Sequence, residues 1–233
     1  MDSVVYSLRH FFRFLEKRGY DIRRIWIILS FPMRAKTIKP TFTDEEIEQI
    51  LRSIDRDCCP GKRNFAILTL LIYTGIRAGD LIALKLTDIC WAEGEIRIVQ
   101  EKTGTPVSIP LQKPALTALA DYILNERPKI KHPNVFLTCM APHRSFSSGS
   151  DIDGILKKCM KKADIAFRKG DGKSTHGLRR YFATSVMSGG ATADMVAELL
   201  GHSGISATRQ YISIDISGMR RCVLPMSSLG GEG

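Results

Sequence analysis

The first stretch of the chain has apolar side chains at helical spacing. Between residues 3 and 18 they recur every three or four positions, at Val4, Leu8, Phe11, Phe12 and Leu15. Basic side chains occupy another face, and Gly19 ends the pattern. The apolar stretch IWIILSFP then continues to Pro32. One or two helices of this size cannot form a hydrophobic core of their own, so we expect this segment to pack against another surface.

A second helical region begins at residue 43. The letters TDEE form a capping box in which the Thr43 hydroxyl serves the backbone N–H of Glu46, whose side chain reaches back. Apolar residues follow at helical spacing, at Ile47, Ile50, Leu51 and Ile54. The next segment, NFAILTLLIYTG, is apolar on almost every side, which predicts a buried helix that ends at Gly75. A short helix with Leu81, Leu84 and Leu86 comes next.

The period changes from helical to alternating in EIRIVQEKTGTPVSIPL. Ile96 and Ile98 alternate with polar residues, and Val107 and Ile109 do the same after a glycine-containing turn. This pattern predicts a β-hairpin with Lys102 and Gly104 near its tip.

The remaining chain returns to helical patterns. We expect helices at 114–126 and from about 151 to 166, a polar loop at 142–150, and helices from about 176 onward, interrupted by glycines 189, 190 and 201. Residues 35–43, AKTIKPTFT, have the composition of a linker. The predicted fold class is therefore mainly α with a small antiparallel β-sheet (α+β).

Charge narrows the choice of partner. The 233 residues hold 34 Lys and Arg against 24 Asp and Glu, a net charge of +10, and this favours a polyanion, nucleic acid before a membrane surface. The apolar run at 65–73 is too short to span a bilayer, and arginines at 9 and 13 leave no secretory signal. The six cysteines form no CxxC pair and no zinc-spaced cluster. These features predict a reduced, cytoplasmic protein without a metal or other cofactor.

Several charged positions have both a structural and a chemical interpretation. Arg77 follows the helix-ending glycine and could pair with Asp80, or it could bind an anion. His176 and Arg179 in HGLRR share a face at a helix start, where an anion would bind, but they could also be surface charges. Lys102 could be an ordinary solvated turn lysine.

A run of lysines marks a second basic region. KKCMKKA places Lys157 and Lys161, and likewise Lys158 and Lys162, at i, i+4 on one helix face, a repulsive arrangement that phosphates would neutralise. With Lys169 and Lys173 nearby, we interpret this as a track for a DNA backbone; the alternative is a solvated helix face.

The last motif is LGHSGISATRQYI at residues 200–212. Gly201 would let the chain turn at the end of a helix, and Tyr211 lies nine residues after His202. The two side chains could simply pack on neighbouring helices, or both could face one phosphate.

In combination these motifs are more specific than any one of them. The order TGIR, KTG, HGLR, LGH and a tyrosine nine residues on resembles the tyrosine recombinases, the phage-integrase family, over roughly residues 41–215. LRHFFRFLEKRGY is similar to the last part of that family's N-terminal core-binding domain. The resemblance implies the tyrosine recombinase catalytic-domain fold.

The resemblance also implies roles. Tyr211 would attack a DNA phosphodiester to give a 3′-phosphotyrosyl link, and Arg77 and Arg179 would clamp the non-bridging oxygens. His176 would take or share the tyrosine proton, Lys102 would protonate the 5′-oxygen, and His202 would bond the phosphate. Asp80 would orient Arg77. Neither metal nor ATP would be needed, because the arginines replace the metal and the phosphotyrosine keeps the bond energy.

The implied organisation has four parts. Residues 1–34 would be the end of a helical DNA-clamp domain, 35–42 a linker, 43–214 the catalytic domain and 215–233 a tail with a helical pattern at 216–226. That tail would dock on a neighbouring protomer or fold back on its own core. The expected function is site-specific recombination of double-stranded DNA by a homo-tetramer, in integration or excision of a mobile element. The alternatives are a type IB topoisomerase-like nicking-closing enzyme and a non-catalytic DNA-binding relative.

Overall fold

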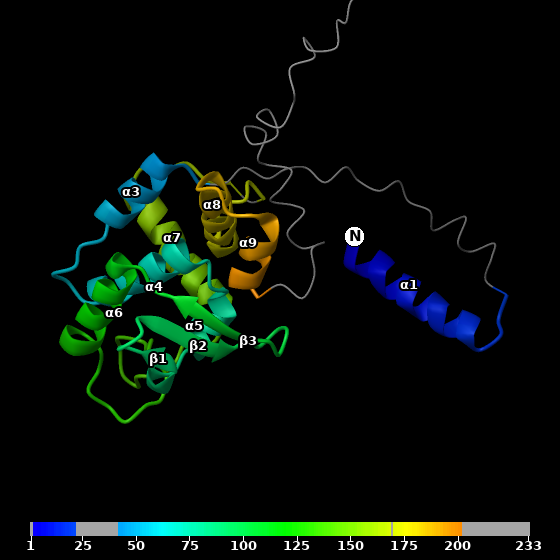
Figure 1. The fold of residues 1–233 in the computed structure, drawn as a ribbon, viewed down its shortest axis with the longest axis horizontal. Coiled ribbons are helices and arrows are strands. Elements are labelled where there is room, and N and C mark those ends of the chain that lie inside the picture. Colours follow the sequence, from blue (N-terminus) through cyan, green and yellow to red (C-terminus); the bar gives the residue numbers. More distant parts are fainter. Residues whose placement is uncertain (1, 22–41, 169, 202–233) are drawn as a thin grey trace, which may run out of the picture. The chain divides into compact units, whose positions relative to one another are not determined.

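The protein divides into two compact units, Met1–Thr37 and Ile38–Gly233. A computed structural model describes residues 2–21, 42–168 and 170–201 (Figure 1). The apolar stretch 25–32, the tail pattern at 216–226 and the candidate residues Lys169, His202 and Tyr211 lie outside the described residues. Among the helices that are described, none has the length and apolar character needed to cross a membrane.

The first unit contributes one described helix, α1 (Asp2–Lys17). It ends as the sequence predicts: the N–H of Arg18 donates to the carbonyl of Phe14, and Gly19 has a φ of 87°, in the left-handed region that favours glycine. Phe11 and Phe14 are 53% and 51% exposed, so α1 leaves aromatic rings uncovered within the part of its unit that is described.

Two of the predicted helices open the second unit. Helix α3 (Asp44–Arg52) begins with the predicted capping box, in which the Glu46 N–H donates to Thr43 Oγ1 at 3.2 Å and the Thr43 N–H donates to Glu46 Oε2 at 3.3 Å. Helix α4 (Gly61–Thr74) is buried over most of its length and ends at Gly75 with a φ of 61°. Both expectations from the sequence are confirmed.

The sheet lies beside a short helix, α5 (Ala78–Ala83), and a 3₁₀ turn, η1 (Leu86–Asp88). Its three antiparallel strands are β1 (Ile89–Cys90), β2 (Glu95–Val99) and β3 (Pro106–Pro110), in the order β1-β2-β3. The predicted hairpin is confirmed, and in its register Ile96 pairs with Ile109 and Ile98 with Val107. The two residues of β1 are too few to show an alternating pattern in the sequence.

The remaining helices are α6 (Lys113–Asn125), α7 (Gly149–Lys162), α8 (Thr175–Ser188) and α9 (Ala193–Leu199). Helix α7 is shorter than the predicted 151–166, and the prediction was wrong at its C-terminal end. Asp164 has a φ of 55°, which breaks the right-handed helix, and Ile165 N–H bonds back to the Met160 carbonyl at 2.9 Å.

Helix α4 lies at the centre of the second unit, in contact with α3, α6, α7 and α8 (Figure 1). Its side chains Ile67, Leu68 and Leu70 are fully buried, which explains why its sequence is apolar on almost every side. A smaller cluster of Ala183, Val196 and Leu200 joins α8 to α9. The core therefore fixes the C-terminal end of α4, the middle of α8 and the end of α9 relative to one another.

Candidate active site

Arg77 is positioned by the tight turn at the end of α4. At Gly75 an added Cβ would lie 2.6 Å from a ring carbon of Phe182, and the φ of 61° also disfavours any other residue. The turn sends Ile76 into the core, where it is 4% exposed, and makes Arg77 the N-cap residue of α5. The side chain of Arg77 keeps 22% of its surface exposed, so the guanidinium lies at the border between core and solvent.

Arg77 is held from two sides. Its Nη1 donates a hydrogen bond to Gln100 Oε1 and lies 3.7 Å from Asp80 Oδ2. The other oxygen of Asp80 accepts the backbone N–H of Glu101 at 3.0 Å. The local Arg77–Asp80 pair suggested by the sequence is therefore present. Within the described part of the chain, Nε and Nη2 of Arg77 have no hydrogen-bond partner, so the same guanidinium still has donors for an anion.

Arg179 is more deeply buried than Arg77. It comes from the second turn of α8, is 4% exposed, and donates to the Gly75 carbonyl at 2.5 Å and to the Leu200 carbonyl at 2.6 Å. These two carbonyls belong to the ends of α4 and α9. Arg179 therefore ties three helices together at the place where Arg77 leaves the core.

The start of α8 is packed closely on the loop before it. A Cβ at Gly177 would lie 2.2 Å from the Gly172 carbonyl oxygen, and Arg180 donates to that same oxygen at 2.8 Å. His176 is exposed in the first turn of α8, three positions before Arg179. The structure thus gives the first half of α8 one exposed imidazole, His176, and two buried guanidinia, Arg179 and Arg180.

Gln100 joins the two arginines and is absent from the residues proposed from sequence. Its Nε2 donates to the Leu200 carbonyl at 3.0 Å, the same oxygen that accepts from Arg179, while its Oε1 accepts from Arg77 and from Thr103 Oγ1 at 3.0 Å. One signal could have identified it. Gln100 continues the inward-facing alternation of Ile96 and Ile98, and a polar residue at such a position indicates a buried hydrogen bond.

Lys102 lies two residues after Gln100 in the turn between β2 and β3. The turn is closed by the Gln100 N–H, which donates to the Thr105 carbonyl at 2.9 Å, and by the Gly104 N–H, which donates to the Gln100 carbonyl at 2.8 Å. Lys102 is exposed at its tip. The neighbouring bond from Glu101 to Asp80 anchors the turn on the residue that pairs with Arg77.

The basic track divides into two kinds of lysine. Four lysines are exposed on the outer face of α7: Lys157, Lys158, Lys161 and Lys162. The opposite face is buried through Ile152, Leu156 and Met160. Lys173 instead pairs with Glu46, at 18% side-chain exposure, and donates to the Ala166 carbonyl at 3.3 Å. Its charge is therefore partly neutralised inside the protein.

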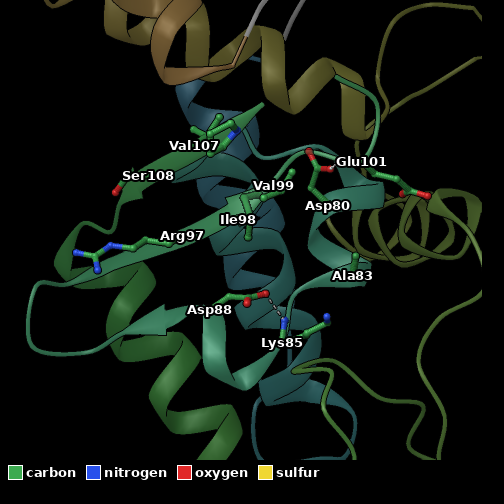
Figure 2. Close-up of a pocket in the computed structure, with 11 residues that line it drawn as sticks. Asp80, Ala83, Lys85, Asp88, Arg97, Ile98, Val99, Glu101, Val107 and Ser108 are labelled. Carbon is green, nitrogen blue, oxygen red and sulfur yellow. Dashed lines mark hydrogen bonds between the residues drawn. The ribbon is translucent and has the colours of Figure 1, made fainter. Parts of the chain in front are cut away.

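A hollow of about 570 Å³ lies along the hairpin (Figure 2). Asp80 and Glu101 lie at one end of it, and Arg97 and Ser108 at the other. Acidic and basic side chains alternate around apolar Val99 and Val107, and neither Arg77 nor Arg179 lines it. This mixed lining does not suit a phosphate, which needs a concentration of cations.

Two other tyrosines of the second unit are unsuitable as nucleophiles. The Tyr181 hydroxyl donates to Asp44 Oδ1 at 2.5 Å, and burial together with that carboxylate raises the pKa of Tyr181. Burial also raises the pKa of Tyr122, whose hydroxyl accepts the Leu137 N–H at 3.2 Å. A phenol with a raised pKa gives up its proton less readily. Neither tyrosine belongs to the Leu200 network, the set of hydrogen bonds that links Arg77, Gln100 and Arg179 to the Leu200 carbonyl.

The helical body around α4 and the three-stranded antiparallel sheet define the class: the fold is that of tyrosine recombinase catalytic domains. The crystal structure of XerA recombinase superposes with a TM-score of 0.65 at 23% identity, covering 89% of this chain and 69% of that one. XerH recombinase in a post-cleavage complex gives 0.66 at 21% identity, covering 82% and 54%. The chain belongs to the phage integrase family, whose family model matches residues 40–217.

Relatives by sequence agree with this assignment. The y4rA protein of Sinorhizobium fredii, named as an integrase/recombinase, is 33% identical over 226 residues, which cover 95% of this chain and 54% of that protein. Tyrosine recombinase XerD of Listeria innocua is 32% identical over 89% of this chain and 69% of its own length. The chain spans about half the length of the first curated relatives that it matches.

Proposed function

We propose that this chain cleaves and rejoins double-stranded DNA through a 3′-phosphotyrosyl intermediate on Tyr211. The observation that carries the proposal is the shared Leu200 carbonyl, which brings Arg179 and, through Gln100, Arg77 to one locus. Leu200 is two residues before His202 and eleven before Tyr211 in the sequence. The candidate phosphate ligand His202 and the candidate nucleophile Tyr211 therefore follow soon in the sequence after Leu200, the residue through which the two arginines are linked.

The chemistry is an in-line displacement at phosphorus. The Tyr211 oxygen forms a bond to phosphorus as the bond from phosphorus to the 5′-oxygen breaks, so the number of phosphoester bonds is unchanged. His176 accepts the phenol proton and Lys102 supplies the proton that the 5′-oxygen takes up. The free 5′-hydroxyl of either the same or another strand reverses the step. The chain therefore needs no external energy source for rejoining.

The arginines stabilise the transition state by being in place before it forms. Phosphoryl transfer spreads added negative charge over the non-bridging oxygens, and a planar guanidinium donates two parallel hydrogen bonds to such oxygens. Arg179 is fixed by two backbone carbonyls, and Arg77 by Gln100 and Asp80. Donors that need no reorganisation give the largest electrostatic effect, about 3 kcal/mol or more for each one.

Around this centre we propose the domain plan that the sequence suggests. Residues 1–34 end a DNA-clamp domain, 35–42 link it to the catalytic domain at 43–214, and 215–233 form the coupling tail. The exposed lysines of α7 follow the DNA backbone. Among similar structures, XerH is bound to a palindromic difH substrate and lambda integrase is a dimer bound to a core site. For this chain we propose a tetramer on two duplexes.

The biological setting that we propose is integration or excision of a mobile element. The structures similar to this chain include the Tn1549 transposon integrase in complex with a circular intermediate DNA. The y4rA relative is named as an integrase/recombinase, and this name also supports a role in integration or excision.

The test is covalent capture on DNA. Random-sequence duplexes are selected on the full 233-residue chain, and the selected duplex is then prepared with a nick at successive positions, so that the cut fragment diffuses away. Wild type should form a denaturant-resistant protein–DNA adduct. Tyr211→Phe should form none, while Tyr181→Phe should form as much as wild type. An adduct that persists in Tyr211→Phe contradicts the proposal.

Two further outcomes separate the alternatives. Binding without an adduct on any nicked duplex would show a non-catalytic DNA-binding protein. Relaxation of a supercoiled plasmid that lacks the selected sequence would show a topoisomerase-like nicking-closing enzyme. Strand exchange between two selected duplexes would support the recombinase.

A further inference from the structure

The buried side chain of Gln100 makes more hydrogen bonds than a residue that only fills space in the core would need. It is 2% exposed, and its carboxamide makes three hydrogen bonds in which each atom has the correct polarity. The oxygen faces two donors, Arg77 and Thr103, and the nitrogen faces one acceptor, the Leu200 carbonyl. This pattern fixes which end of the amide is which, because the opposite orientation would place like groups together.

The chain makes room for this amide at Gly201. A Cβ there would lie 2.4 Å from Nε2 and 2.5 Å from Oε1 of Gln100, and Gly201 has a φ of 60°. The LGH motif therefore needs its glycine for two reasons: the left-handed turn and the close approach of the Gln100 side chain. The residue after this glycine is His202.

Gln100 also closes the turn that carries Lys102. Its N–H and carbonyl bond to Thr105 and Gly104, and its side chain bonds to Thr103 inside the turn. One residue thus contacts the segment of the proposed general acid, the guanidinium of Arg77 and the oxygen that holds Arg179.

We infer that Gln100 is a positioning residue for the cleavage reaction, which holds the Arg77 guanidinium on the scissile phosphate and keeps it in register with Arg179. The inference rests on the proposed function. Gln100 itself does not contact the phosphate: all three of its side-chain bonds are made within the protein. Its effect on the rate is exerted through Arg77.

The test compares two changes at Gln100 with a matched change elsewhere. Gln100→Ala removes all three bonds. Gln100→Glu keeps the acceptor for Arg77 but adds a negative charge and faces the Leu200 carbonyl without a donor. Asn134→Ala is the control, because Asn134 is a partly buried amide whose Nδ2 donates to the Ile82 carbonyl at 2.9 Å and is not part of the Leu200 network.

Single-turnover cleavage of the selected, nicked duplex is the first readout. Gln100→Ala should slow adduct formation about 10- to 100-fold, the loss typical of a small misplacement of a catalytic group, while its Kd for DNA stays within about twofold. Gln100→Glu should be slower still, because its carboxylate neutralises Arg77. Asn134→Ala should match wild type. Gln100 variants as fast as wild type would overturn the inference.

A modified phosphate separates a positioning role from general loosening. Replacing one non-bridging oxygen of the scissile phosphate by a methyl group removes the charge that Arg77 meets. On this methylphosphonate duplex Gln100→Ala and wild type should react at nearly the same rate, as Arg77→Ala and wild type should. A deficit as large as on ordinary DNA would contradict a route through Arg77.

Hydrogen exchange keeps this inference distinct from the proposed function. In the absence of DNA, Gln100→Ala should speed exchange of the Gly104 amide at least about 10-fold over wild type, and Asn134→Ala should not. If wild type forms no adduct, the proposed function fails, and unchanged exchange in Gln100→Ala would then overturn the structural role of Gln100 as well.

Discussion

The two arginines and the lysine of the proposed site are held in opposite ways. Arg179 is buried and bonded to two backbone carbonyls, and Arg77 is bonded to a buried amide and paired with a buried carboxylate. Lys102 is exposed at the tip of a turn between two strands. The same site thus combines cations fixed by the core with a cation carried on its edge.

The difference matches the role that we propose for each group. A group that stabilises charge is most effective when it is already oriented, because no energy is then used to reorganise it during the reaction. A proton donor must approach the leaving oxygen closely and then withdraw, which suits a hairpin tip. In the proposed mechanism, rigid support therefore suits the two arginines and exposed support suits Lys102.

The largest effect is expected at Arg179. Arg179→Ala removes the side-chain donor of the buried Gly75 carbonyl and leaves the Leu200 carbonyl with the Gln100 amide as its side-chain donor. The free energy of unfolding in urea should therefore fall by about 1–3 kcal/mol, and adduct formation should fall at least about 100-fold. The control is Arg180→Ala, which removes another buried guanidinium that donates to the Gly172 carbonyl. It should lose stability but keep cleavage. Equal cleavage in both variants would show that Arg179 is only structural.

The next effect concerns Lys102. Lys102→Ala should slow cleavage about 100-fold, while the melting temperature stays that of wild type because the side chain is exposed. A duplex with sulfur in place of the scissile 5′-oxygen should restore the rate, since a thiolate leaves without being protonated. If the sulfur-containing duplex did not restore the rate, or if Lys102→Ala lowered the melting temperature, the proposed difference between Lys102 and the arginines would be contradicted.

A smaller effect is expected from the basic track. The double variant Lys157→Gln, Lys161→Gln should weaken DNA binding and reduce the slope of log Kd against log salt by about 2, because each lysine that neutralises a phosphate contributes about 1 to that slope. Lys173→Gln should change the slope much less, because Lys173 pairs with Glu46. Fluorescence anisotropy at several salt concentrations measures both. Equal slopes for the two variants would mean that α7 does not follow the backbone.

The smallest effect is expected at Tyr181. Burial and Asp44 raise the pKa of this phenol, so the folded state holds its proton more tightly than the unfolded state. The bond therefore stabilises the protein fully below the unfolded pKa, about 10, and is lost as pH rises above it. Tyr181→Phe should cost about 1 kcal/mol at pH 8 and less at pH 11 by urea unfolding. A deficit that grows with pH would reverse the assignment.

The fold could be predicted from the sequence because the apolar residues that form the core recur at helical or alternating spacing. The capping box at Thr43, the buried helix ending at Gly75 and the hairpin that contains Ile96 could all be predicted from these patterns. The end of α7 was not, because it depends on a left-handed residue, Asp164, that is not a glycine. Strand β1 is too short to carry a pattern.

The site was only partly predictable for a different reason. Arg77, Asp80 and Arg179 were identified from motifs, and the structure places them around the ends of α4 and α9. Gln100 was missed because its partners, Arg77 and Leu200, are 23 and 100 residues away and bind through an amide and a backbone carbonyl. Contacts of that kind leave no local pattern in a sequence.

The central claim is that two guanidinia, held through one carbonyl, meet a single phosphate in front of Tyr211. A crystal structure of the full chain carrying Tyr211→Phe, bound to the selected duplex, tests it most directly. We predict Arg77 and Arg179 nitrogens about 2.7–3.1 Å from non-bridging oxygens of the same phosphate, with the residue-211 ring opposite the 5′-oxygen. Arginines on different phosphates, or a residue-211 ring far from that phosphorus, would contradict the claim.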